Sequence, residues 1–489
     1  MGIKKETENG LNRRDFGKAF SAAGLAAISG VMSGPLAWAA EKEEDVQKRR
    51  AEMVTSLANA DHQIDEKVYQ RFSSKNNAFN AYSRDLGKPW MMPWIQNREK
   101  AMAQGNSGTY TNAGSPESAR SFAALSEGLN FMNYVTSPYG TGMENVGLLA
   151  WNNPLAKDPR VTPPIMVPGL MPPQLKDPTQ LTTQAKVVAR LTGADLVGIC
   201  KLDRKWVLDS TQRNSYTAEV PVLKSVVFKD QPMPEETDTE LIIPEDVTYA
   251  IVLGFEQNRI MMQSAPSACA AATVSHGYSR MGIGATSLAQ YIRGMGYTAI
   301  PTKNDTALSV PLAVDAGLGE GSRMGMVITP EFGPNIRIAK VLTNMPLIPD
   351  KPIEFGVHKF CTICKKCARE CPSKAISNGE PGWEARNECN NPGIYKWYND
   401  HKKCLQYWID NGYSCIRCVA VCPFTKGAMP GHDISKWAIN NASFTNKFWI
   451  TVDDAFGWGV KRDPRELWDI KVGTYGLDPV KFSGTNYKG

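Results

Sequence analysis

Apolar residues in the middle of the chain follow the spacing of alternating helices and strands. Recurrence every three or four positions predicts helices at 178–191 and 273–296, and a further short helix is expected near 309–315. Continuous apolar runs predict buried strands at 194–202, 247–255, 297–302, 325–329 and 336–342. Helices and strands that alternate in this way are typical of an α/β fold.

The ends of the first helix are marked by its sequence. Asp177 and Pro178 form a favourable start, and Gly193 follows Leu191 as a typical end. The helix at 273–296 carries a regular apolar face that consists of Tyr278, Met281, Ala285, Leu288, Ile292 and Met295. By its spacing alone, a tyrosine on such a face is more often a core residue than a catalytic one.

The flanking segments have a weaker pattern. Residues 41–58 are charged and favour helix, and residues 60–150 are rich in Asn, Ser, Gly and aromatics, with a helix expected at 115–129. Eight prolines in the 26 residues of 153–178 predict an extended covering segment or linker. The polar, proline-containing stretch 203–246 is expected to be an irregular insertion into the α/β domain.

Four glycines, Gly317, Gly319, Gly321 and Gly325, lie between the predicted helix and strand near the end of the α/β region. They do not follow a strand in a βαβ unit, so they are poor evidence for a dinucleotide-binding fold. An alternative is that they let the backbone lie close to a flat cofactor.

Length and charge limit the classes of function. A chain of 489 residues is expected to form two to four domains, and its net charge of +6 is too mild to indicate a nucleic-acid partner.

The N-terminus has the features of an export signal. Arg13 and Arg14 precede a weakly apolar, Ala/Gly-rich stretch at 19–36, and Ala37-Trp38-Ala39 precedes Ala40. This order predicts a twin-arginine signal over 1–39 and a mature chain that is periplasmic or peripheral at the outer face of the cytoplasmic membrane. A transmembrane anchor fits less well because the stretch is interrupted by glycine and barely long enough to span.

Eight of the eleven cysteines lie between positions 361 and 422, in two runs. The first run, Cys-x-x-Cys-x-x-Cys-x-x-x-Cys-Pro, repeats the bacterial ferredoxin pattern, in which the fourth cysteine binds the other cluster. We therefore predict two 4Fe-4S clusters. The first cysteine set, expected to hold the proximal cluster, comprises Cys361, Cys364, Cys367 and Cys422. The second cysteine set, expected to hold the distal cluster, comprises Cys371, Cys404, Cys415 and Cys418.

Structural zinc and disulfides are the alternatives to clusters. Zinc sites usually show paired Cys-x-x-Cys knuckles without the Cys-x-x-x-Cys-Pro ending, and disulfide scaffolds belong to short chains with little core. Of the other cysteines, Cys200 and Cys269 are expected in the core, and Cys389 is a weaker candidate ligand.

The combination of these features resembles the respiratory reductive dehalogenases, most of all those that act on tetrachloroethene. The residues that carry the resemblance include Tyr278-Ser279-Arg280-Met281, Gly333-Pro334-Asn335-Ile336-Arg337, the segment 344–357, the segment 364–374 and the segment 418–427. The resemblance implies a nitroreductase-like corrinoid-binding domain with a C-terminal two-cluster ferredoxin-like module. The domain boundaries expected on this basis are 1–39 for the signal, 40–176 for an N-terminal unit, 177–355 for the corrinoid-binding α/β domain, 356–430 for the module and 431–489 for a C-terminal segment that completes the core.

The resemblance also assigns roles to single residues. Tyr278 matches the family's proton donor, Arg337 its neighbouring arginine, Asn304 a pocket asparagine and Trp408 a pocket aromatic beside the cofactor. A tyrosine, whose pKa is ordinarily near 10, needs its anion stabilised to act as an acid, and fixed positive charge at Arg337 would do this. Two positions depart from the family: the segment 128–130 lacks an expected aromatic, and Val274 replaces a hydroxyl residue.

The histidines agree with the corrinoid that the family uses. None of His62, His276, His358, His401 and His432 lies in the Asp-x-His-x-x-Gly setting that ligates cobalt. The resemblance implies a base-off corrinoid, and this histidine pattern agrees with it; each histidine is expected to be a surface or packing residue.

The predicted function is reductive dehalogenation of a small chlorinated alkene, of the tetrachloroethene or trichloroethene class, in anaerobic organohalide respiration. A small integral-membrane anchor protein and a quinone-linked electron donor are the implied partners, no nucleic acid is expected, and a homodimer is a candidate assembly. Two alternatives stay open: an enzyme like epoxyqueuosine reductase, which the export signal and weak charge oppose, and an exported iron–sulfur electron carrier, which would contain no cobalt.

Overall fold

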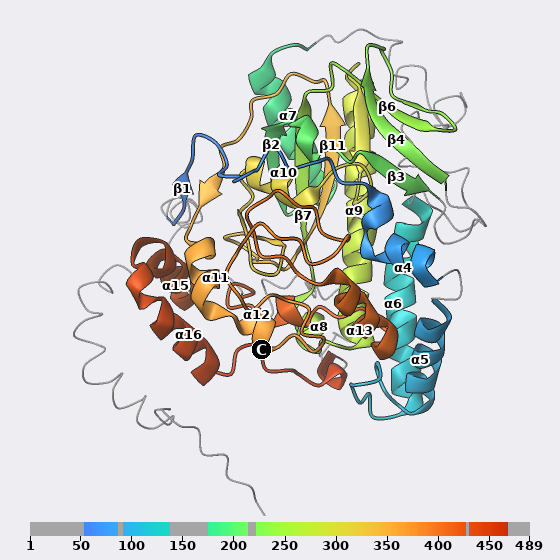
Figure 1. The fold of residues 1–489 in the computed structure, drawn as a ribbon, viewed down its shortest axis with the longest axis vertical. Helices are drawn as coiled ribbons and strands as arrows, with labels where there is room; N and C mark the ends of the chain where they lie inside the picture. The colour runs from blue at the N-terminus through green and yellow to red at the C-terminus, as the bar shows by residue number, and fades with distance from the viewer. Residues whose placement is uncertain (1–52, 87–90, 137–174, 214–221, 427–429, 468–489) are drawn as a thin grey trace, which may run out of the picture.

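The computed structural model describes residues 53–86, 91–136, 175–213, 222–426 and 430–467. Figure 1 shows a sheet-containing upper half and a helical lower half that is divided into a left and a right group of helices. In the described part of the chain, no helix combines the length and apolar character that crossing a membrane requires. The predicted export signal, and the proline-rich passage up to residue 174, lie outside the described residues.

A four-stranded sheet forms the centre of the fold. Its strand order is β2-β7-β11-β8, and every neighbouring pair is antiparallel. The bounds are β2 Leu196–Lys201, β7 Tyr249–Glu256, β8 Ala299–Thr302 and β11 Ile336–Thr343. Successive side chains of β7 pack on opposite faces: Ile251 and Leu253 lie in one core, and Ala250 and Val252 in another. Burial on both faces explains why these strands are continuously apolar in sequence.

Helices α7 (Pro178–Leu191) and α9 (Ala268–Gly294) cover one face of this sheet. The Asp177 carboxylate accepts a hydrogen bond from the Thr179 N–H at the start of α7, and Gly193 has a φ of 98° just beyond its end. Helix α10 (Ser309–Asp315) lies on the opposite face, in front of the sheet in Figure 1. The predicted helices and central strands are thus confirmed to within a few residues, although α9 begins earlier than predicted.

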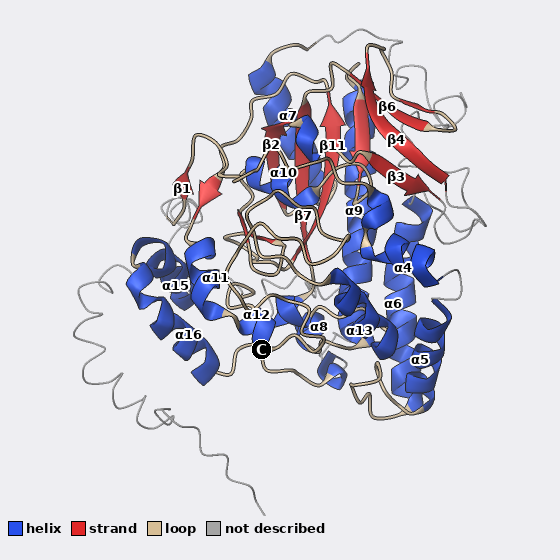
Figure 2. Cartoon of the chain, in the orientation of Figure 1, coloured by secondary structure: helices blue, strands red, loops and turns tan. Residues whose placement is uncertain are grey.

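The expectation of an irregular insertion at 203–246 is wrong in its local structure. This stretch forms a second four-stranded sheet, in the order β3-β4-β6-β5, in which β4 and β6 are parallel. The bounds are β3 Ser210–Arg213, β4 Val222–Lys229, β5 Glu235–Glu236 and β6 Glu240–Pro244. Among the described side chains of β4 only Val226 is buried, and the buried run of β6 spans only residues 241–244, so the apolar signal of each strand is short. Figure 2 shows this second sheet beside the central one.

The right-hand group of helices packs along α9. It consists of α4 (Ala78–Leu86), α5 (Met92–Ala103), α6 (Pro116–Thr136) and α13 (His401–Asn411), with the short α8 (Arg259–Gln263) nearby. Helix α6 begins near the predicted position and is longer than predicted. Its packing against α9 buries Phe122 beside Cys269 and Ala272, which confirms Cys269 as a core residue.

The left-hand group contains the last helices. These are α11 (Val357–Cys364), α12 (Lys366–Arg369), α14 (Arg417–Ala420), α15 (Pro430–Asn441) and α16 (Asn446–Ala455), and α12 and α14 lie toward the centre. Two strand pairs connect this region to the rest: β1 (Thr55–Ser56) pairs with β12 (Ile353–Glu354), and β9 (Glu320–Gly321) with β10 (Val327–Ile328). The helix expected at 41–58 is wrong for residues 53–58, because Thr55 and Ser56 form a strand with a partner distant in sequence.

Candidate active site and cluster-binding residues

Three of the predicted site residues meet although they come from three elements. The Asn304 Nδ2 atom donates a 2.8 Å hydrogen bond to the Tyr278 hydroxyl oxygen, and the Arg337 guanidinium carbon lies 4.7 Å from the centroid of the Tyr278 ring. Tyr278 projects from α9, Arg337 from β11 and Asn304 from the loop after β8. Because the amide N–H donates to the tyrosine oxygen, the phenolic proton is left for another acceptor.

A small residue permits the approach of Arg337 to α9. A Cβ atom at Gly277 would lie 2.7 Å from the Arg337 Cγ atom, closer than any ordinary contact. The Arg337 Nε atom also donates to the Gln257 side-chain oxygen at 3.2 Å, which fixes the guanidinium on the side of Tyr278. Within the part of the chain that the structure describes, Arg337 forms no ion pair with a carboxylate, so its positive charge faces the Tyr278 ring without a competing partner.

A buried lysine holds the loop that carries Asn304. The Lys340 ammonium, on β11, donates to the Lys303 carbonyl, to the Ala307 carbonyl at 2.9 Å and to the Ser309 hydroxyl at 3.0 Å. These acceptors bracket Asn304 in sequence. Burial lowers the pKa of Lys340 to about 8, against a smaller rise from Asp305. Sequence reasoning did not identify Lys340, although a lysine inside the apolar run of β11 was a visible signal.

The first cysteine set lines one small cavity at the lower centre of the molecule. Its members come from α11, α12 and the turn after α14. Burial raises the pKa of Cys361 to about 12, with a further rise from the neighbouring Cys364 thiol. Burial likewise raises the pKa of Cys422, and next in size is the effect of Cys361. Such mutual effects require that the four thiols lie close together, as the ferredoxin rule predicts.

The members of the second cysteine set are also neighbours. Burial raises the pKa of Cys404 to about 12, with smaller rises from Cys418 and Cys371. The pKa of Cys415 is raised by burial and then by Cys418, Cys404 and Cys371. Cys389 does not appear among these effects, so the described contacts give no support for it as a ligand.

Trp408 lies one helical turn after Cys404 on α13. Its ring packs against Phe79 and Trp94, with centroid distances of 6.0 and 6.3 Å. Its buried indole N–H has no hydrogen-bond partner among the described residues, and it acts to lower the pKa of Cys404. A buried donor beside a thiol fits a deprotonated cluster ligand, whose sulfur accepts such a bond.

One core cluster connects Tyr278 to the cysteine sets. Tyr278 packs against buried residues that include Cys361, Cys367 and Cys422 of the first set, and Cys418 of the second set packs against the same cluster. Burial raises the pKa of Cys418 to about 11, and the Arg337 charge acts in the opposite direction. The sequence assigned the proximal position to the first set, and this order stays a prediction.

A cavity of about 560 Å³ lies beside this site, under α10 and α11. Leu308 and Ser309, which follow the Asn304 loop, contribute to its wall, whereas Tyr278, Asn304 and Arg337 do not. Three of the five histidines, His62, His358 and His401, line it. His62 bonds to the Asp315 carboxylate at 2.7 Å, and His358 stacks on Trp397 at 4.7 Å between centroids.

The four glycines divide into two groups in the structure. A Cβ atom on Gly317 would lie 2.3 Å from the Lys351 carbonyl oxygen, and one on Gly319 would lie 1.9 Å from that of Ile328. These two are required by the packing of the chain on itself. Gly321 and Gly325 line the cavity, and a Cβ on Gly321 would meet nothing within 4 Å. Only these two agree with the idea of backbone close to a cofactor.

The N-terminal wall of the site includes helix α6. The Ser279 hydroxyl donates to the Leu129 carbonyl at 2.7 Å, which joins α6 to α9 one residue after Tyr278. Val274, one turn earlier, is buried. Of the two positions that depart from the family pattern, Val274 therefore lies one turn before Tyr278 on α9, and the segment 128–130 lies on α6, where it contacts α9 next to Tyr278.

Comparisons with known proteins give a consistent result. The family model described as "4Fe-4S double cluster binding domain" matches residues 360–425. The tetrachloroethene reductive dehalogenase of Sulfurospirillum multivorans is 42% identical over 500 residues, which cover 99% of this chain and 98% of that protein. That of Desulfitobacterium hafniense is 39% identical over 274 residues, 52% of this chain and 49% of that protein.

A solved structure supports the fold. It is entitled "Reductive dehalogenase structure suggests a mechanism for B12-dependent dehalogenation" and superposes with a TM-score of 0.56 and 22% identity, covering 86% of this chain and 53% of that one. The mixed α/β fold, the double-cluster domain near the C-terminus and the full-length relative agree. The chain belongs to the reductive dehalogenase family.

Proposed function

We propose that the protein replaces chlorine by hydrogen on a small chlorinated alkene of the tetrachloroethene or trichloroethene class. The reaction consumes two electrons and one proton, breaks a carbon–chlorine bond, forms a carbon–hydrogen bond and releases chloride. The full-length relative from Sulfurospirillum supports the substrate class. The observation that carries the proposal is the convergence of Tyr278, Asn304 and Arg337.

The α/β core is proposed to be a nitroreductase-like corrinoid-binding domain. The cavity of about 560 Å³, which Gly321 and Gly325 line and which has open space beside Gly321, is the region that would take part of the corrinoid. A corrinoid bound there would supply the low-potential cobalt chemistry that reduction of a carbon–chlorine bond needs. The corrinoid is proposed to be base-off without a histidine ligand, which the Asp315 bond of His62 and the Trp397 stacking of His358 support.

Tyr278 is proposed to deliver the proton. Loss of the phenolic proton leaves a negative oxygen, which the Asn304 N–H and the Arg337 guanidinium stabilise. Trp408, on the side of α13, would contribute a wall that excludes water. The departures at 128–130 and at Val274 lie on the α6 side of this site, so they are positions where the substrate range of this chain would differ from that of its relatives.

The eight cysteines are proposed to hold two 4Fe-4S clusters in the two sets defined above. The first set is proposed to lie next to the reaction site, which the packing of Tyr278 against the core cluster of Cys361, Cys367 and Cys422 supports. Electrons would then enter at the second set and pass to the first.

The cellular setting follows from the N-terminal signal. Twin-arginine export of the folded, cofactor-loaded protein would place it at the outer face of the cytoplasmic membrane, with cleavage before Ala40. A small integral-membrane anchor protein and a quinone-linked donor are the proposed partners, and a homodimer the proposed assembly.

The experiment is anaerobic purification, metal analysis and a chloroethene assay with reduced viologen. The wild-type protein should contain about eight irons and one cobalt. Tyr278→Phe should retain both metals and lose roughly a hundredfold or more in turnover, the scale of a positioned general acid. Arg337→Lys keeps the charge but loses the planar guanidinium, so it should also be impaired. Near-normal turnover by Tyr278→Phe with full cofactors would remove Tyr278 as the proton donor.

A further inference from the structure

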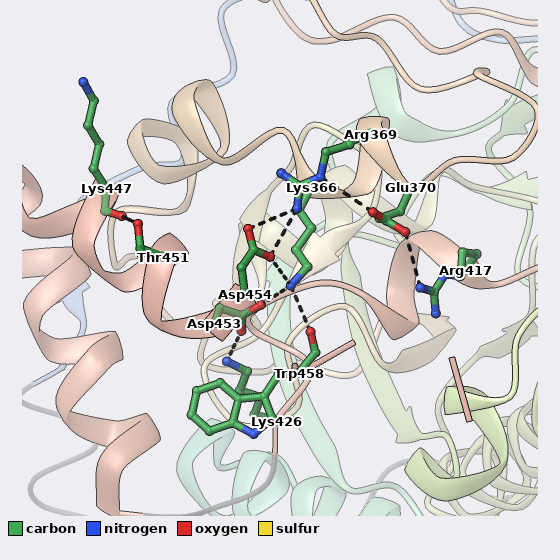
Figure 3. A network of polar contacts seen from close by, with 10 residues as sticks. All are labelled: Lys366, Arg369, Glu370, Arg417, Lys426, Lys447, Thr451, Asp453, Asp454 and Trp458. Carbon is green, nitrogen blue, oxygen red and sulfur yellow. Dashed lines mark hydrogen bonds and ion pairs between the residues drawn. The ribbon is translucent and has the colours of Figure 1, made fainter. Parts of the chain in front are cut away.

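Two buried lysines beside the first cysteine set share a single buried carboxylate. Lys366, between Cys364 and Cys367 in sequence, and Lys426, after Cys422, both form ion pairs with Asp453 of α16. The exposed fractions of these three side chains are 6%, 12% and 2%. Figure 3 shows Asp453 between the two ammonium groups.

Further contacts hold this group in place. The Lys366 ammonium also donates to the Trp458 carbonyl at 2.9 Å, and the Lys426 ammonium lies 3.8 Å from the centroid of the Trp458 ring. Asp454 pairs with Lys366 at 2.9 Å, but its side chain is 44% exposed. Within the buried part, two positive charges therefore face one negative charge.

These charges lie beside the first set. Lys366 directly precedes Cys367 on α12, and α16, which carries Asp453, packs against α11, the helix of Cys361 and Cys364. Two other buried charges lie at α11: Arg323, which donates to the Cys361 carbonyl at 3.0 Å, and Glu320, which accepts from the Val357 N–H at 3.1 Å. They come from a different segment and do not contact Asp453.

The buried ion pairs of Lys366 and Lys426 with Asp453 are not explained by stabilisation of α16 alone. Burying three charges costs desolvation energy that an apolar contact would avoid, so a buried ion pair is weak evidence for stability. The reduction potential of an iron–sulfur cluster, by contrast, responds to net charge and to hydrogen bonds around its sulfurs.

We propose that Asp453 sets the reduction potential of the cluster held by Cys361, Cys364, Cys367 and Cys422, by offsetting the charge of Lys366 and Lys426. A positive charge favours the reduced, more negative cluster, and Asp453 opposes this effect. The carboxylate keeps the potential low, so that an electron accepted there is passed on toward the reaction site. This inference rests on the ligand assignment proposed above.

Potentiometric titration followed by electron paramagnetic resonance tests it on anaerobically purified holoenzyme. Asp453→Asn removes a negative charge and should raise the potential of one cluster; Lys426→Gln removes a positive charge and should lower it. Each change should alter the ratio of reduced to oxidised cluster on the order of tenfold at a fixed applied potential, which corresponds to about 59 mV for one electron. The double variant Asp453→Asn/Lys426→Gln should return close to the wild-type potential.

Asp454→Asn is the matched control. It removes the neighbouring carboxylate on the same helix, and solvent screening at this exposed position should make its effect several-fold smaller. Iron content is measured on every variant: about eight irons in the wild-type protein tests the ligand assignment separately from the potential.

The outcomes distinguish charge from structure. If the Asp453→Asn protein fails to assemble its clusters, the reduction potential of the Lys426→Gln protein tests the proposal instead. In that variant Asp453 keeps Lys366 as its ion-pair partner, so the structure should be retained. Unchanged potentials in a fully loaded Lys426→Gln protein would overturn the proposal and leave Asp453 as a fastening for α16. A double variant that shifts further than either single variant would overturn it too, because compensation of charge would then be absent.

Discussion

Replacement of Lys340 by methionine tests how the Asn304 loop is held. Lys340 is fully buried, and its ammonium donates to two carbonyls and one hydroxyl on either side of Asn304. Methionine has a similar length and no polar group, so the variant keeps the packing of β11 and removes only the donor and its charge.

The cost in stability follows from two opposing effects. Hydrogen bonds from a charged donor are worth about 1.5–3 kcal/mol each, and three are lost. Against this, burial lowers the pKa of Lys340 from 10.5 to about 8, which corresponds to a penalty of about 3 kcal/mol for the charged form that methionine does not incur. The net loss should be about 1.5–6 kcal/mol, measured by the urea midpoint of the far-ultraviolet circular dichroism signal.

The loss in activity should exceed what instability alone produces. Without Lys340 the carbonyls on either side of Asn304 lose their donor, so Asn304 would no longer be held at Tyr278. Loss of the Asn304 hydrogen bond to the developing negative oxygen of Tyr278 would then raise the activation free energy by about 1.5–3 kcal/mol. Turnover at full iron and cobalt content should therefore fall roughly tenfold to a hundredfold. Lys201→Met is the control, since Lys201 is an exposed lysine on β2 of the same sheet.

A double variant shows whether Lys340 acts through Asn304. If it does, Lys340→Met/Asn304→Ala should be no slower than Asn304→Ala alone. Multiplied defects, or a Lys340→Met enzyme that is as stable and as fast as the wild type, would refute the reasoning.

Three further predictions concern other parts of the chain. Cys422→Ser should damage the cluster of the first cysteine set, seen as loss of one of two resonance signals; damage confined to the other cluster would contradict the crossed ligand assignment. Arg13→Lys with Arg14→Lys should block export and leave a longer precursor in the cytoplasm, and unchanged maturation at Ala40 would speak against a twin-arginine signal. Because the pKa of Lys340 is lower in the folded protein, the unfolded chain binds more protons than the folded one between about pH 8 and 10.5. The free energy of unfolding of the wild type should therefore rise across this pH window relative to that of Lys340→Met, by at most about 3 kcal/mol. Urea midpoints of the two proteins that run parallel across the window would show that the pKa shift is absent.

The sequence was most informative where local pattern determines structure. The bounds of α7 follow from Asp177, Pro178 and Gly193, and the buried strands from continuous apolar runs. The second sheet was missed because β4 buries few side chains and the buried run of β6 is short. The two strands stabilise each other by pairing, which the pattern within either strand does not show. Single-residue roles at Tyr278, Asn304 and Arg337 came from the family resemblance, since nothing in their local pattern separates them from packing residues.

The order of the clusters illustrates a limit that spacing cannot overcome. Cysteine spacing determines which thiols can share a cluster, because the ligands are joined by short loops. Which cluster lies nearer the reaction site depends on how the whole module packs against α9, β11 and α16, and no spacing rule contains that information. Packing contacts carry that information: Tyr278 packs against a core cluster that contains Cys361, Cys367 and Cys422 of the first set. The ion pairs of Asp453 with Lys366 and Lys426 place a buried charge beside the same set, where a low potential would drive an accepted electron on toward the reaction site.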